Sequence, residues 1–114
     1  MGGLEEDRHW VSRLNAARLA PLIEWSIADR GIVVARLLAL REDENRFVRP
    51  WALGAVWRMV GSEDPRRLHV ESWMGETLGS GSAAERARAR ILLAQDARRA
   101  RRAEGSPVPT RAKR

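Results

Sequence analysis

Residues 86–102 carry the side chains of this sequence that are best suited to binding a charged partner. Seven arginines occupy these seventeen positions, separated mainly by alanine and leucine. A guanidinium group binds phosphate through two parallel hydrogen bonds, and small neighbours let a sugar–phosphate backbone come close. We therefore expect binding to nucleic acid backbone, with little base specificity, at seven residues: Arg86, Arg88, Arg90, Arg98, Arg99, Arg101 and Arg102.

The positive charge of the chain is concentrated in this C-terminal region. The whole chain has a net charge of +6. Residues 1–85 hold eleven arginines and thirteen carboxylates, a balance of −2, whereas residues 86–114 hold nine arginines and one lysine against two carboxylates, a balance of +8. A basic block beside a nearly neutral body is typical of contact with nucleic acid, and less often with anionic lipid. An ordinary solvated helix rich in arginine and alanine is the alternative.

A helical wheel places these arginines around a thin apolar edge. At about 100° per residue, Ala89, Leu92, Leu93 and Ala100 form one seam, which Asp96 joins. We expect the helix to dock by this seam and to present its arginines outward. Because the arginines surround the helix instead of facing a wide apolar stripe, the pattern argues against insertion into a membrane surface.

The remaining residues do not form a pattern typical of catalysis or metal binding. Cysteine is absent, which excludes disulfides, thiolate nucleophiles and cysteine-containing zinc sites. His9 and His69 have no second histidine or carboxylate three or four residues further along the chain. The acidic residues 42–44 lack the spacing of a calcium loop, and no glycine-rich loop ends in Gly-Lys-Ser/Thr. We expect a protein that is not an enzyme and has no metal or cofactor.

Glycine and proline divide the chain into segments that are typical of helices. Alternating β-branched residues are few, and no Asn-Gly or Asp-Gly hairpin signal is present. We expect an all-α protein, a compact bundle of about five to six helices that ends in the basic helix. Residues 1–103 should form a single domain, and residues 104–114 a disordered basic tail. The expected helices are residues 4–19, 21–30, 32–41, 47–60, 66–78 and 83–103.

Apolar periodicity indicates which of these helices form the core. The helix of residues 47–60 is apolar on nearly every side, with Gly54 and Arg58 on its one open stripe, so we expect it at the centre. In the next helix, Leu68, Trp73 and Leu78 are expected to be buried. Tryptophan can also stack on unpaired bases. However, every expected helix of residues 1–85 except that of residues 32–41 contains at least one tryptophan at an apolar position, which favours a role in the core. The five tryptophans are Trp10, Trp25, Trp51, Trp57 and Trp73.

Two local signals bear on the ends of the helices. Gly31 is expected to stop the helix of residues 21–30. Ser82, followed three residues later by Glu85, has the form of a capping box and predicts where the basic helix begins. Elsewhere, no run of about 18 apolar residues is present, and the first ten residues lack the order of a signal peptide. We therefore expect a cytoplasmic protein with no membrane partner.

A series of short motifs follows in order between residues 42 and 96. An acidic-Asn stretch precedes the apolar helix that ends in Arg58-Met59-Val60, and Met74-Gly75-Glu76-Thr77-Leu78 comes next. Glu85-Arg86-Ala87-Arg88 and Leu92-Leu93-Ala94-Gln95-Asp96 follow a glycine-serine joint. This order resembles the small subunit of Cascade-type CRISPR effector complexes, in which the last three segments read apolar-Gly-Arg-Ala-Leu, Glu-Arg-Arg and Leu-Leu-x-x-Asp. Glu76 and Thr77 stand in place of the family's Arg-Ala.

The resemblance implies a non-catalytic small subunit of an RNA-guided antiviral effector, of a short type I or type IV form. Its implied partners are guide RNA, target DNA, the CRISPR backbone and large subunits, and several copies of the chain itself. Arg86 and Arg88 are the nucleic-acid-binding positions that match its motifs. The alternative is a stand-alone helical DNA-binding or phage or plasmid accessory protein, with a helix-turn-helix around residues 61–65. A membrane-surface or protein–protein adaptor is a third possibility.

Overall fold

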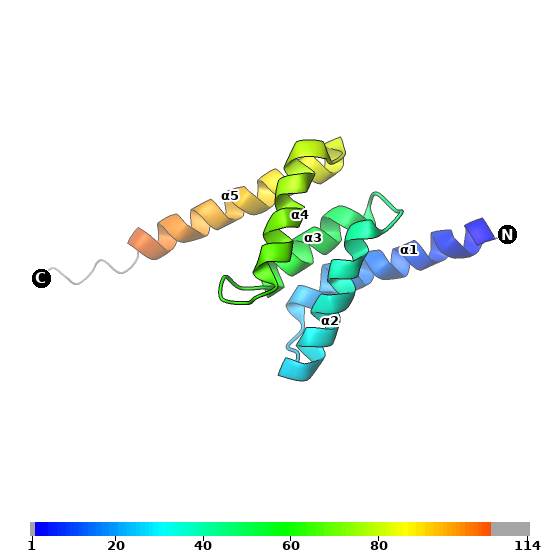
Figure 1. Ribbon diagram of the computed structural model, residues 1–114, viewed down its shortest axis with the longest axis horizontal. Helices are drawn as coiled ribbons and strands as arrows, with labels where there is room; N and C mark the ends of the chain where they lie inside the picture. The colour runs from blue at the N-terminus through cyan, green and yellow to red at the C-terminus, as the bar shows by residue number, and fades with distance from the viewer. Residues whose placement is uncertain (1, 106–114) are drawn as a thin grey trace, which may run out of the picture.

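The computed structural model describes residues 2–105, with side chains for residues 10–104, and this part of the chain is all helical (Figure 1). It contains five α-helices and no strand, as expected for an all-α bundle. The tail expected at residues 104–114 is wrong at its first two residues, because α5 continues through Gly105, and the rest of it lies outside the described residues. The helices are α1 (Gly2–Leu19), α2 (Ile27–Ala39), α3 (Val48–Met59), α4 (Arg67–Ser80) and α5 (Ala83–Gly105), with 3₁₀ turns η1 (Ala20–Leu22) and η2 (Leu40–Glu42).

Helix α3 is the centre of the bundle, as its apolar pattern predicts. The other four helices all pack against it, and α1 and α5 extend from it toward opposite ends of the molecule (Figure 1). Trp57 and Trp73 belong to the core, whereas the other three tryptophans are half-buried. The buried residues of α3 lie on all sides of the helix: Val48, Pro50, Ala52, Leu53, Gly54, Ala55, Val56, Trp57 and Met59.

The prediction of two helices, at residues 21–30 and 32–41, is wrong, because the structure has the single helix α2 in this region. Residues 21–26 form the end of η1 and an extended link, and Ser26 caps α2 by accepting a hydrogen bond from the Asp29 backbone N–H at 3.1 Å. Gly31 lies inside α2, where the burial of Val34 and Leu37 offsets the low helix propensity of glycine. The Ser26–Asp29 spacing is the capping signal that marks this start.

The expected burial of Leu68 and Leu78 is also wrong. Leu68 is 79% exposed and Leu78 is 36% exposed. Helix α4 buries a different stripe, Val70, Trp73, Met74 and Thr77, whose spacing of three and four residues defines one helical face. Leu68 lies on the opposite face of that helix. The packing of α4 against α3 and α5 selects the face that contains Trp73.

Gly54, expected on an open stripe, is buried beneath α5. A Cβ atom at this position would lie 3.4 Å from Arg88 Nη2 and 3.7 Å from Leu92 Cδ2. The absence of a side chain therefore lets α5 pack closely against α3. Arg58, one turn further along α3, is exposed as expected.

Candidate nucleic-acid interface

Helix α5 begins at a capping box, which confirms the signal at Ser82 and Glu85. The Glu85 N–H donates to Ser82 Oγ at 3.2 Å, and the Ser82 N–H donates to Glu85 Oε1 at 2.8 Å. The other carboxylate oxygen of Glu85 pairs with Arg49 Nε of α3 at 2.9 Å. Burial would raise the pKa of the Glu85 carboxyl, but Arg49 and Ser82 together hold that pKa below its ordinary value. Glu85 therefore stays charged and ties the start of α5 to α3.

The docking edge of α5 is shorter than the apolar seam predicts. Glu85, Ala89 and Leu92 are buried, and the next position on the same face is Asp96, which accepts a hydrogen bond from Trp57 Nε1 at 2.7 Å. Leu93 and Ala100, expected in the seam, are exposed. From residue 97 to residue 104 every side chain of α5 is exposed, so this half of the helix projects from the bundle with its arginines accessible.

Two of the seven predicted arginines are engaged within the fold. Arg86 Nη1 donates to the Gly81 carbonyl oxygen at 2.7 Å. The Arg88 guanidinium lies over the Trp51 ring, 4.3 Å from its centroid, and its Nε atom is buried without a hydrogen-bond acceptor. Burial and the nearby charge of Arg58 lower the pKa of Arg88. The expectation that α5 presents all its arginines outward is therefore wrong for the two residues that match the CRISPR motif.

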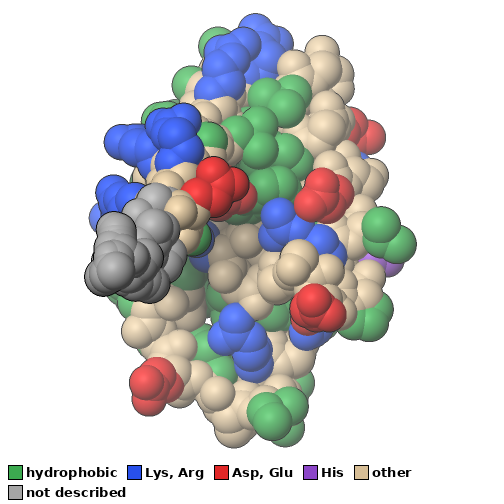
Figure 2. All heavy atoms as spheres, turned by 90° about the vertical axis from the view of Figure 1, so that its left-hand side faces the viewer, with side chains coloured by type: hydrophobic (Ala, Val, Ile, Leu, Met, Phe, Trp, Pro, Cys, Tyr) green, Lys and Arg blue, Asp and Glu red, His purple; other side chains and the backbone are tan. Residues whose placement is uncertain are grey.

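The other five predicted arginines are exposed, and three of them converge with a residue of α3. Arg98, Arg99 and Arg102 of α5 surround a hollow of about 350 Å³ together with Arg58 and Gln95. Arg90 and Arg101 do not line it. Figure 2 views the molecule from the side on which α5 ends; basic side chains lie along the upper left border of that face and also near its centre and lower part. We call this cluster of Arg58, Gln95, Arg98, Arg99 and Arg102 the basic hollow.

The charges of the basic hollow are largely uncompensated. Within the described part of the chain, Arg58, Arg98 and Arg102 have no carboxylate partner, and Arg99 makes only a long contact of 3.7 Å to Asp96. No carboxylate lines the hollow. Four guanidinium groups from two helices around one open space give this surface the charge and the donors to attract polyanions. Sequence reasoning did not assign Arg58 to this site, although its place on the one open stripe of a buried helix was a usable signal.

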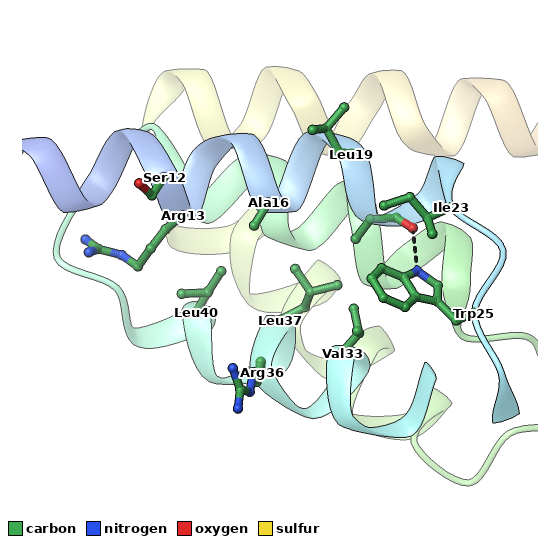
Figure 3. Close-up of a pocket in the computed structure, with 11 residues that line it drawn as sticks. Ser12, Arg13, Ala16, Leu19, Ile23, Trp25, Val33, Arg36, Leu37 and Leu40 are labelled. Atoms are coloured by element: carbon green, nitrogen blue, oxygen red, sulfur yellow. Dashed lines mark hydrogen bonds between the residues drawn. The ribbon is translucent and has the colours of Figure 1, made fainter. Parts of the chain in front are cut away.

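A second, larger hollow lies between α1 and α2 and is apolar (Figure 3). Its volume is about 640 Å³. Val33 and Leu37 of α2 and Leu40 of η2 point toward Ala16 on α1. Trp25 closes one end, with its Nε1 donating to the Ala20 carbonyl oxygen at 2.9 Å. Arg13 at the other end pairs with Asp43 at 2.6 Å. The lining offers apolar surface but no nucleophile paired with a base.

The described residues include no group of three or more histidine, cysteine or carboxylate side chains that could hold a metal ion. His69 is exposed, and the His9 side chain lies outside the described ones. Among the described helices, none is both long enough and apolar enough to cross a membrane. The fold and the basic hollow together define an all-helical domain with a cationic surface. Comparison with known protein families, curated proteins and solved structures finds no match for the chain.

Proposed function

We propose that this protein is a non-catalytic helical subunit that binds the sugar–phosphate backbone of nucleic acid through the basic hollow. The observation that carries the proposal is the convergence of Arg58 with three arginines of α5 without a carboxylate in the lining. Guanidinium groups that lack a protein partner can bind phosphate without first breaking an ion pair. Arg86 and Arg88, which are held inside the fold, act in this proposal by positioning α5.

Two double variants of α5 test whether the basic hollow, rather than net charge, binds the nucleic acid. Arg98→Gln with Arg102→Gln removes two charges from the hollow, and Arg90→Gln with Arg101→Gln removes two exposed charges elsewhere on the same helix. Fluorescence anisotropy with labelled RNA and DNA, between about 50 and 200 mM salt, gives the affinity and its salt slope. The hollow variant should lose about 10-fold or more in affinity and about two units of slope. Equal losses in both variants would contradict the proposal.

Within this proposal, the assembly is an RNA-guided CRISPR effector, as the resemblance implies. The apolar hollow between α1 and α2 supports a protein that works in contact with other subunits, because apolar patches of this kind commonly mark protein–protein contacts. A subunit of such a complex should bind nucleic acid weakly alone and tightly when guide RNA and backbone subunits are present. If the pure protein binds nucleic acid tightly and its affinity does not change with guide RNA and backbone subunits, a stand-alone DNA-binding protein is favoured instead.

A stand-alone DNA-binding protein with a helix-turn-helix around residues 61–65 fits the structure poorly. Helix α4 would be its recognition helix, and the exposed residues of α4 include Glu71 and Glu76. Its one arginine, Arg67, is engaged by the backbone oxygen of Val60 at 2.8 Å and by Glu71 at 2.9 Å. A recognition helix usually presents cationic and amide groups to the major groove, so carboxylates here disfavour entry into duplex DNA.

A further inference from the structure

One face of helix α3 leads from aromatic residues near its N-terminal end to Arg58 in the basic hollow. Phe47, the residue that precedes α3, is followed at helical spacing by Trp51, Gly54 and Arg58. Steps of four, three and four residues place these positions on one face of the helix. We call this face the α3 stripe. Cationic side chains lie beside it along its length. They are Arg46 at Phe47, Arg18 and Arg88 at Trp51, and Arg98, Arg99 and Arg102 around Arg58.

The two aromatic rings of the α3 stripe differ in their exposure. Trp51 is half-buried, and the guanidinium groups of Arg18 and Arg88 lie over its ring at 5.4 and 4.3 Å from the centroid. Phe47 is 48% exposed. About half of Phe47 is therefore open to another planar group, although Arg46 and Trp10 also contact its ring. The Trp51 ring, by contrast, is half-buried beneath Arg18 and Arg88.

Contacts around Phe47 hold its ring in place. The Phe47 backbone N–H donates to Asn45 Oδ1 at 2.7 Å. The Trp10 ring lies 5.8 Å away at an interplanar angle of 34°, and the Arg46 guanidinium lies 5.2 Å from the Phe47 centroid. An aromatic side chain fixed in this way loses little conformational freedom when it binds, and the adjacent cation suits a negatively charged strand.

We infer that a single strand binds along the α3 stripe with phosphates in the basic hollow and an unpaired base stacked on Phe47, crossing over the Arg18 and Arg88 side chains that cover the middle of the stripe. This inference rests on the proposed function and names the nucleic acid class that the site prefers. The eleven residue steps from Phe47 to Arg58 span about 16 Å, which is roughly five nucleotides at a stacked spacing of about 3.4 Å. A duplex keeps its base faces covered and cannot use Phe47 in this way.

The test compares Phe47→Leu with the wild-type protein on three probes. The probes are a labelled oligo-dT of about 12 nucleotides, an abasic strand with the same number of phosphates, and a duplex of equal length. Phe47→Leu should weaken oligo-dT binding about 5-fold or more, because leucine keeps the apolar volume but lacks the π face. Binding to the abasic strand and the duplex should change less than 2-fold. Phe47→Trp should restore oligo-dT binding.

The outcomes separate this inference from the proposed function. If Phe47→Leu leaves oligo-dT binding unchanged while Arg98→Gln with Arg102→Gln weakens it, the stacking site is overturned and the basic hollow stands. If Phe47→Leu weakens all three probes equally, or Phe47→Trp restores nothing, the residue has only a structural role and the inference is overturned. If the wild-type protein binds none of the probes, alone or with its partner subunits, the proposed function itself fails.

Discussion

The indole N–H of Trp57 in α3 donates a hydrogen bond of 2.7 Å to the Asp96 carboxylate in α5, at the point where α5 leaves the bundle. The Trp57 ring is buried in the core and also lies 3.9 Å from the Arg67 guanidinium of α4. Asp96 thus gives the buried indole its acceptor, and among the described residues it is the last one of α5 that is half-buried rather than exposed. The pair links three helices near the basic hollow.

Removing the acceptor from this pair should destabilise the fold. Asp96→Ala leaves the Trp57 N–H without a partner, which is expected to lower the free energy of unfolding by about 1–3 kcal/mol. Asp96→Asn keeps an acceptor oxygen and should cost less than half as much. Urea unfolding followed by circular dichroism measures both. Equal losses for alanine and asparagine would show that the carboxylate charge, and not the hydrogen bond, stabilises the junction.

Two glycines of the α4–α5 region should respond to alanine in opposite directions. A Cβ at Gly81 would meet the Thr77 carbonyl oxygen at 2.6 Å, so Gly81→Ala forces the backbone to move and should cost about 1–3 kcal/mol. Gly75 lies inside α4 with no atom within 4 Å of its added Cβ. Gly75→Ala should therefore raise stability by about 0.5–1 kcal/mol. Thermal unfolding of the two variants distinguishes them, and a stabilised Gly81→Ala would disprove the close contact.

Arg88 should be replaceable by an apolar side chain without loss of stability. Its buried Nε has no acceptor, a cost of about 1–3 kcal/mol that offsets the roughly 1–2 kcal/mol from its half-buried contact with the Trp51 ring. Arg88→Met keeps the long side chain and should leave the free energy of unfolding unchanged or raise it by about 1 kcal/mol. Arg88→Ala loses the packing and should lower it. A marked loss in the methionine variant would show that the guanidinium itself stabilises the α3–α5 contact.

Glu85 should make stability depend on pH in the acid range. Its pKa in the folded protein lies below the ordinary value of 4.5, so its contribution is present above pH 4.5 and is lost as the pH falls through the folded pKa. Glu85→Gln should be less stable than wild type at pH 7, and the difference should shrink below pH 4.5. Glu24→Gln, which changes an exposed carboxylate, serves as the control. A difference that stays constant with pH would exclude the ion pair with Arg49 as its source.

The contacts of the basic helix limit which substitutions can probe binding cleanly. Alanine at Arg86 and Arg88 removes a hydrogen bond to Gly81 and the cover of Trp51. Both changes are expected to alter stability as well as binding. Arg98 and Arg102, with exposed side chains, are the better choice because their loss should change the surface charge with little effect on the fold.

The amino-acid sequence by itself determined the helical class, the central place of α3, the start of α5 at Ser82 and the uneven distribution of charge. These features depend on spacing and composition within short segments, where local hydrogen bonds and apolar periodicity decide the outcome. It did not determine which arginines are free, because each guanidinium either meets a partner from another helix or does not. Only the tertiary structure placed Arg88 over Trp51, buried Gly54 beneath α5 and brought Arg58 beside Arg98 and Arg102. Close packing between helices sets these long-range neighbours, and the period of a single helix cannot encode them.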